Sequence, residues 1–224
     1  MSNKIFNLQD NIIKYEHKYL ILRVNNIFKE TFIKNMYNII LSLPNKYWIN
    51  IAGFDTTKDE SIIIKKNMKR INHFNKKTIE AFRKDNLSFN FHKTHYMKNI
   101  LCKILNSKYF IDYINKITKN KFNITYLRSV FISKYKSGHF LSPHSDKNNG
   151  KIGFVINLSR NWKPYYGGNL NFLDDERQNI IHSITPSFNN ILVFEIPDDG
   201  IPHFVSHIAP NIKNVRFAIS GWFS

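Results

Sequence analysis

From residue 124 to the C-terminus, the sequence is a series of short apolar runs separated by turn residues. The runs are rich in β-branched and aromatic residues, which favour strands, and each is shorter than a typical helix. Gly, Pro, Asn and Asp occupy the breaks between them, as they do in turns. The runs cover residues 127–135, 153–158, 169–173, 181–184, 190–196, 203–208 and 216–223. Strands at this spacing predict an antiparallel sandwich or barrel.

The first half of the chain has a helical pattern instead. Apolar residues recur at three- and four-residue steps from Phe28 to Leu43, where Pro44 ends the run, and again over residues 96–118. We therefore expect an α+β fold with a β-barrel core over residues 124–224 and supporting helices over residues 28–123. The length of 224 residues suits one domain, spanning residues 28–224, with residues 1–27 as an N-terminal extension.

The cysteine content and the hydropathy of the chain favour certain cellular compartments over others. Its single cysteine, Cys102, cannot form an intramolecular disulfide, which fits a reducing compartment. The N-terminus carries charges throughout, and no apolar run reaches the ~18 residues of a membrane span. We expect a soluble, intracellular, cytoplasmic protein with no membrane association.

The net charge of +17 favours acidic or polyanionic partners. The lysines are nevertheless scattered along the chain, and its abundance of Asn, Lys and Ile is typical of an AT-rich genome. Both interpretations remain open, and no stable complex with nucleic acid is expected.

His144 and Asp146 form a His-x-Asp triplet. In an extended segment, residues i and i+2 project to the same side, so this imidazole and this carboxylate can face one point. A second histidine from a distant strand would complete the two-His, one-carboxylate set of non-haem Fe(II) oxygenases. The alternative is a surface histidine beside a solvated aspartate. His203 and His207 both offer the missing imidazole, and strand alternation cannot separate them.

Arg216 lies in the apolar run at the C-terminus. Alternation places it on one face with Ala218, Ser220 and Trp222. A buried guanidinium requires an anionic partner, and a dicarboxylate ligand would provide one, since arginine binds carboxylates with two parallel hydrogen bonds. The alternatives are an internal Asp or Glu partner, or an exposed edge position.

The order of these motifs resembles the 2-oxoglutarate- and Fe(II)-dependent oxygenases, and within them the prolyl-hydroxylase branch. The catalytic domain of the ribosomal-protein prolyl hydroxylases is especially similar. The resemblance rests on residues 135–146, 153–162, 166–170, 186–196 and 216–223, with residues 86–95 similar to a segment that precedes the core in those enzymes. It implies a double-stranded β-helix, that is, a cupin-like jelly roll, with the N-terminal helices packed on one face.

The resemblance also implies roles for individual residues. Iron would be held by His144, Asp146 and His203, because the family pattern His-x-Val-x-x-apolar fits residues 203–208 and gives His203 preference over His207. Arg216 and Tyr135 would bind the cosubstrate 2-oxoglutarate. The cofactors implied are Fe(II) and O2, with ascorbate as a further candidate.

The activity implied is hydroxylation of a prolyl residue in a protein or peptide, with succinate and CO2 as co-products. The basic charge adds the expectation of a substrate associated with nucleic acid, such as a ribosomal protein. One alternative is an oxygenase acting on a small molecule or nucleic acid, although nucleic-acid demethylases carry a second Arg where Trp222 stands. Another is a non-catalytic barrel that binds a ligand. It is favoured by Ala218 and Asn157, where relatives often carry Ser and Tyr respectively.

Overall fold

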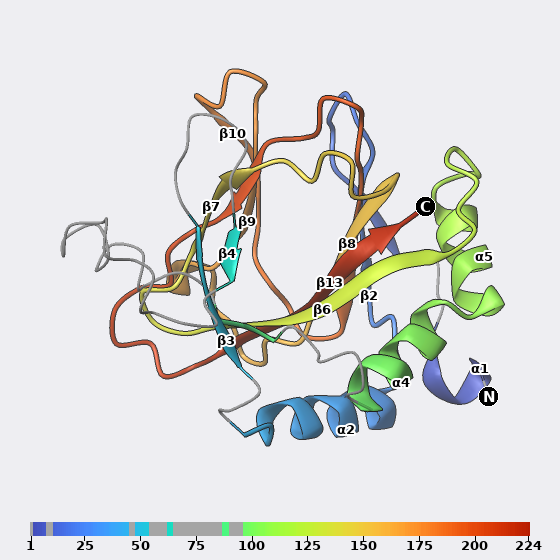
Figure 1. The fold of residues 1–224 in the computed structure, drawn as a ribbon, viewed down its shortest axis with the longest axis horizontal. Coiled ribbons are helices and arrows are strands. Elements are labelled where there is room, and N and C mark those ends of the chain that lie inside the picture. The colour runs from blue at the N-terminus through green and yellow to red at the C-terminus, as the bar shows by residue number, and fades with distance from the viewer. Residues whose placement is uncertain (1, 8–10, 45–47, 54–61, 65–86, 90–95) are drawn as a thin grey trace.

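The computed structural model describes residues 2–7, 11–44, 48–53, 62–64, 87–89 and 96–224, and in this part of the chain two antiparallel sheets form the core (Figure 1). The larger sheet has, in order, β1 (Ile12–Lys14), β2 (Ile21–Asn25), β11 (Asn190–Glu195), β8 (Ile152–Asn157), β13 (Arg216–Phe223), β6 (Leu127–Tyr135), β5 (Leu87–Phe89), β3 (Ile49–Gly53) and β4 (Ile62–Ile64). The smaller sheet has β10 (Ile180–Ile184), β9 (Leu170–Leu173), β12 (His203–Val205) and β7 (Leu141–His144).

Among the described residues, the α-helices precede the core strands in sequence, and one short 3-10 helix lies between two of those strands. They are α1 (Ser2–Ile5), α2 (Glu30–Leu41), α4 (Tyr96–Leu105), α5 (Lys108–Ile117) and η3 (Pro164–Tyr166). The second helical stretch of the sequence is thus two helices. Ser107 separates them because it has extended backbone angles and its hydroxyl accepts a hydrogen bond from the Phe110 N–H, which caps α5.

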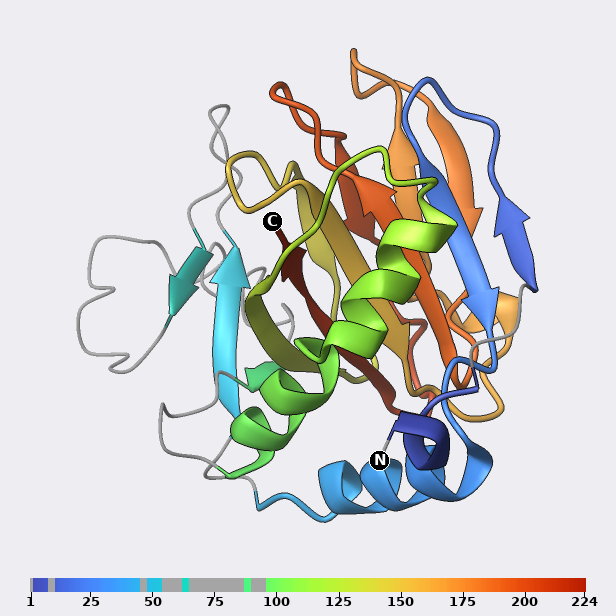
Figure 2. The same cartoon turned by 90° about the vertical axis from the view of Figure 1, so that its right-hand side faces the viewer.

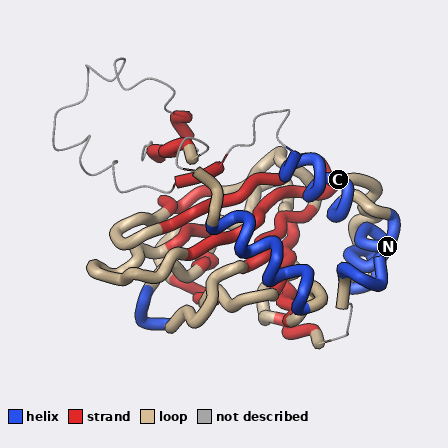
Figure 3. Tube along the Cα trace, turned by 90° about the horizontal axis from the view of Figure 1, so that it is seen from below, coloured by secondary structure: helices blue, strands red, loops and turns tan. Residues whose placement is uncertain are grey.

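The helices cover the outer face of the larger sheet, as Figure 2 shows for α4 and α5. Ile33 of α2, Leu101 of α4 and Phe110 of α5 are buried in one apolar cluster with sheet residues such as Ile156 and Ile219. In the view of Figure 3, α2 crosses the sheet on the same side. These apolar contacts explain the helical spacing of apolar residues in the first half of the chain.

A second apolar cluster fills the space between the two sheets. It includes Leu192 and Phe194 of the larger sheet, and Phe172 and Val205 of the smaller one. Alternate residues of a strand therefore contact different layers: Ile191 packs toward the helices and Leu192 toward the opposite sheet. The expected α+β fold, with a jelly-roll core and helices on one face, is confirmed.

Residues 12–25, which we expected to lie in an N-terminal extension, join the larger sheet. β2 pairs with β11 over five residues, from Ile21↔Phe194 to Asn25↔Asn190, and Ile21, Leu22 and Val24 are buried. Residues 28–123 likewise supply strands β3, β4 and β5 in addition to helices. Such short strands are stabilised by their neighbours in the sheet more than by their own sequence, so no pattern in the chain marked them. Residues 86 and 90–95 lie outside the described residues.

Among the described residues, no helix has the length and apolar character needed to cross a membrane.

Candidate metal and cosubstrate site

His144 and His203 are brought together by strand pairing. His144 is the last residue of β7, His203 is the first of β12, and the two are direct partners in the antiparallel register of the smaller sheet. Their rings lie 4.3 Å apart, centre to centre. Asp146 follows β7 by two residues, and its carboxylate faces both imidazoles. The register of two short strands thus places three potential ligands in one place.

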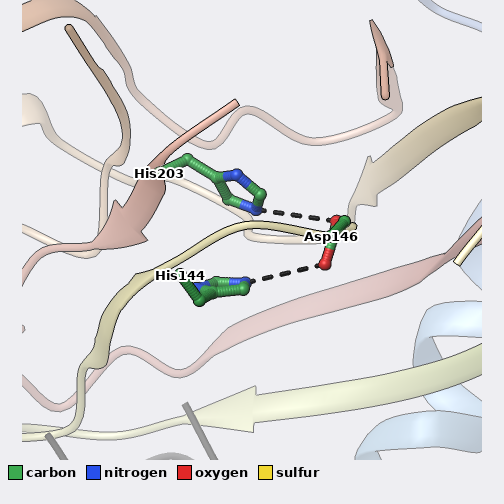
Figure 4. Close-up of side chains that lie close together, drawn as sticks. All are labelled: His144, Asp146 and His203. Atoms are coloured by element: carbon green, nitrogen blue, oxygen red, sulfur yellow. Dashed lines mark ion pairs between the residues drawn. The ribbon is translucent and has the colours of Figure 1, made fainter. Parts of the chain in front are cut away.

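The three side chains converge on a single point (Figure 4). Asp146 Oδ1 lies 3.8 Å from His144 Nε2, and Asp146 Oδ2 lies 3.6 Å from His203 Nε2. One ligand atom from each residue falls within 4.8 Å of the others. Within the described residues, this is the only such group of three or more His, Cys, Asp and Glu side chains.

His203 is oriented by a backbone carbonyl. Its Nδ1 lies 2.7 Å from the oxygen of Ile201, which can only accept a hydrogen bond, so Nδ1 carries the hydrogen. The neutral ring then presents the lone pair of Nε2 to the Asp146 carboxylate. Burial, together with the neighbouring His144, lowers the pKa of His203 to about 4, while Asp146 opposes this shift. A lone pair facing a carboxylate is unfavourable unless a cation lies between them, so the donor set fits a metal ion.

His207, the rival of His203 in the sequence, lies outside this group. Its side chain is exposed and stacks on Phe140, with ring centres 4.0 Å apart. Residue 207 follows the end of β12, so the strand alternation that made the two histidines equivalent does not extend to it.

Arg216 is buried between the sheets, with only 2% of its surface exposed. It pairs in register with Tyr135 of β6, and its guanidinium carbon lies 4.8 Å from the centre of the tyrosine ring. Its Nε has no hydrogen-bond partner, and no acidic side chain of the described residues lies within ion-pair distance. Burial lowers the pKa of the Arg216 guanidinium. A buried cation without a counter-charge is costly, so Arg216 fits the carboxylate of a ligand.

The Gly167-Gly168 turn covers the Arg216 side chain. Gly168 has φ +67°, and a Cβ there would lie 3.1 Å from Arg216 Cδ and 3.2 Å from Ile208 Cγ1. The turn therefore needs glycine both for its left-handed backbone and for the close approach to Arg216. The sequence revealed a turn here, but its contact with the arginine depends on the tertiary fold.

A surface cleft of about 640 Å³ lies elsewhere, beside the start of α2. Lys29, Lys34, Arg160 and Phe188 are among the residues that line it, and none of the site residues described above does so. The three candidate metal ligands and Arg216 therefore lie away from this cleft.

Phe194 supports the metal-ligand group from the larger sheet. Its ring lies 5.3 Å from the His203 ring and 5.5 Å from Phe172, measured between centres. A Cβ on Gly153, the register partner of Phe194, would lie 2.4 Å from Phe194 Cζ. The absence of a side chain at residue 153 therefore makes room for the ring that packs against His203.

We expect Gly153→Ala to displace Phe194 and, through it, His203. Overpacking of this kind costs about 1–3 kcal/mol of unfolding free energy. Denaturant unfolding should show this loss, and a metal titration should show weaker binding. Gly150→Ala, which faces the backbone of Phe223 instead, serves as a control that lowers stability without weakening metal binding in the folded protein. Unchanged metal affinity in folded Gly153→Ala would contradict this role of Phe194.

Comparison with protein families gives one match. Residues 130–224 match the model of the 2OG-Fe(II) oxygenase superfamily. No match was found among curated proteins.

Several solved structures share the fold. A 2OG-Fe(II) oxygenase-family oxidoreductase from Burkholderia pseudomallei has a TM-score of 0.57 at 13% identity, over 91% of this chain and 84% of that one. A Pseudomonas putida prolyl-4-hydroxylase has a TM-score of 0.57 at 13% identity, over 92% and 93%. A Trichoplax adhaerens prolyl hydroxylase in complex with a hypoxia inducible factor peptide fragment has a TM-score of 0.56 at 16% identity, over 91% and 82%.

Two histidines and one carboxylate form the ligand set of non-haem Fe(II) oxygenases, and the three side chains gathered here have that composition. Residues 130–224 are thus similar to the 2OG-Fe(II) oxygenase superfamily, whose members use Fe(II), 2-oxoglutarate and O2.

Proposed function

We propose that the chain hydroxylates a prolyl residue in a protein or peptide, with Fe(II) held by His144, Asp146 and His203. The observation that carries this proposal is the convergence of those three side chains in the same interior as a buried Arg216, which forms no ion pair with the acidic side chains of the described residues. The prolyl substrate is supported by the fold shared with a bacterial prolyl-4-hydroxylase and with a prolyl hydroxylase that binds a peptide fragment.

Each residue has a distinct task in this proposal. The two imidazoles and the carboxylate would hold Fe(II), and a set of three protein ligands would leave positions on the metal for cosubstrate and O2. Arg216 binds the distal carboxylate of 2-oxoglutarate, and Tyr135, which stacks beside the guanidinium, fixes its position. The apolar walls between the sheets exclude water from the site. Bound iron supplies the O2 activation that hydroxylation of an unactivated C–H bond requires.

The net charge of +17 adds an expectation about the partner. A positively charged surface attracts acidic proteins and proteins that are bound to nucleic acid. We therefore place prolyl residues of nucleic-acid-associated proteins, such as ribosomal proteins, first among the substrates to test.

The test is turnover of 2-oxoglutarate with Fe(II), O2 and a set of proline-containing peptides, including segments of ribosomal proteins. We expect succinate release coupled to a peptide product heavier by one oxygen atom, measured by mass spectrometry. Addition of ascorbate to parallel reactions tests whether this reductant sustains turnover. Peptides in which proline is replaced by alanine are the matched control. The same turnover with and without proline would overturn the prolyl assignment while leaving the oxygenase class intact.

A further inference from the structure

The cleft beside the start of α2 lies on the helical side of the larger sheet. Phe28 and Ile33, which line it, belong to the apolar cluster between that sheet and the helices. His203 instead packs against Phe194 in the cluster between the two sheets. The cleft volume of about 640 Å³ lies within the range of roughly 300–1,000 Å³ that is typical of pockets for small molecules. The cleft is thus large enough for a ligand of its own.

Arg160 is a half-buried cation in the wall of this cleft. It follows the end of β8, and its guanidinium carbon lies 4.3 Å from the ring centre of Tyr37 and 4.8 Å from that of Phe188. Those two rings meet edge to face at 5.8 Å, so they hold the guanidinium in one position. Its Nη2 is buried and has no hydrogen-bond partner. A guanidinium that has lost water and gained no acceptor is costly, and an anion in the cleft would offset this cost.

The other charged residues of the cleft leave an excess of positive charge. Lys29, Lys34 and Arg160 line it, against the single carboxylate of Glu30, so the excess is two positive charges. Lys34 bonds Glu30 at 2.5 Å, and its hydrogen bond and charge, followed by the charge of Arg160, lower the pKa of the Glu30 carboxyl. Lys29, which precedes α2, makes no side-chain cap bond, so the first turn of the helix adds positive partial charge.

We propose that this cleft binds a phosphate group, free or as the monoester of a small molecule, between Arg160, Lys29 and Lys34. A phosphate monoester carries about −1.5 to −2 charges at pH 7, which matches the excess of two positive charges, whereas one carboxylate would neutralise only half of it. The planar fork of arginine suits two phosphate oxygens. Phe28 and Ile33 offer an apolar wall to the rest of the molecule. This site is independent of the proposed function, because it shares no residue with the metal and cosubstrate site.

The test is titration of the full chain with sodium phosphate at constant ionic strength, followed by the NMR shifts of its backbone amides. We expect saturable shifts that are concentrated in residues 28–34 and 160–161. Arg160→Met should weaken binding about 10-fold or more, as the loss of hydrogen bonds to a charged group implies, and Arg160→Lys should weaken it less. Lys103→Met is the matched control, since it removes an exposed cation from α4, outside the cleft. Thermal unfolding verifies that each variant is folded.

Glu30→Gln gives an effect of the opposite sign. It removes the carboxylate that competes with the ligand for Lys34, so phosphate should bind about threefold more tightly or better. Asp112→Asn is the matched control, because Asp112 forms the same kind of pair with Lys108, four residues away on α5, outside the cleft. Both variants change the net charge equally, but only Glu30→Gln should change the affinity. A purely structural role of these residues would not produce tighter binding.

Further probes identify the ligand and separate this site from others. Tighter binding of AMP or glycerol 3-phosphate than of inorganic phosphate indicates an ester, the reverse order indicates the free ion, and both support the site. Equal affinity for acetate would overturn the phosphate assignment. Equal losses in Arg160→Met and Lys103→Met would overturn the site, because the net charge alone would then attract the anion. Loss of binding in Arg216→Met, with Arg160→Met unaffected, would overturn it by placing phosphate between the sheets. The absence of saturable binding would overturn it as well.

Discussion

Asp146→Ala should abolish metal-dependent consumption of 2-oxoglutarate. The Asp146 carboxylate lies 3.8 Å from one imidazole nitrogen and 3.6 Å from the other, so it supplies the negative charge of the ligand group. Even residues that only orient metal ligands cost about 10- to 100-fold in affinity or activity when they are replaced. Removal of a ligand should therefore lower Fe(II) affinity by about 100-fold or more. Metal titration and succinate release measure the two effects.

Histidine variants provide the control for this prediction. His203→Ala should lose metal binding as Asp146→Ala does, whereas His207→Ala should retain it, because His207 stacks on Phe140 outside the ligand group. The two substitutions remove the same side chain four residues apart. Full activity in Asp146→Ala, or loss of metal binding in folded His207→Ala with His203→Ala unaffected, would show that the ligand set has been misassigned.

Much of the β core was predictable because its strands carry their own pattern. The runs at residues 127–135 and 216–223 became β6 and β13 with the bounds expected from sequence. Both are long, alternate between the two apolar layers and end at turn residues. Arg216 was also recognisable, because a charged residue within such a run has few positions where it can be stable.

Contacts that depend on how the strands pair could not be predicted from the sequence. No local pattern in the sequence pairs Asn157 with Asn190, which are far apart in the chain and adjacent only once β8 and β11 align. The same holds for β7, a short strand whose pairing with β12 brings His144 beside His203. Long-range pairing is set by the packing of whole sheets, to which a short strand contributes few residues.

Some residues of the candidate site could be recognised in the sequence, whereas others became apparent only in the structure. Residue type and spacing made His144, Asp146 and Arg216 candidates, each with a structural alternative, and the order of the motifs along the chain favoured the functional interpretation. The choice of His203 over His207 instead rested on family resemblance, and the structure adds the physical reason, which is that His203 lies in register with His144 and His207 follows the strand end. Residues that shape the pocket without ionisable groups, such as Gly168 and Gly153, gave no chemical signal in the sequence.

Arg216→Met should separate cosubstrate binding from fold stability more sharply than any other substitution in the chain. The guanidinium is buried, its Nε has no partner, and burial lowers its pKa, all of which show that the fold without ligand bears the cost of this charge. Methionine fills a similar volume without that cost. We therefore expect an unchanged or higher unfolding free energy, together with about 100-fold weaker binding of 2-oxoglutarate because a two-pronged contact with its carboxylate is lost.

Two further variants make this prediction decisive. Arg216→Lys keeps a positive charge but lacks the planar fork, so its affinity for 2-oxoglutarate should lie between those of the wild type and Arg216→Met. Arg128→Met removes an exposed arginine from β6 and should alter neither binding nor stability appreciably. Chemical unfolding and titration of the Mn(II)-loaded protein supply both measurements. Wild-type affinity in Arg216→Met would mean that another cation binds the distal carboxylate, whereas a large loss of stability would mean that Arg216 has a counter-charge within the fold itself.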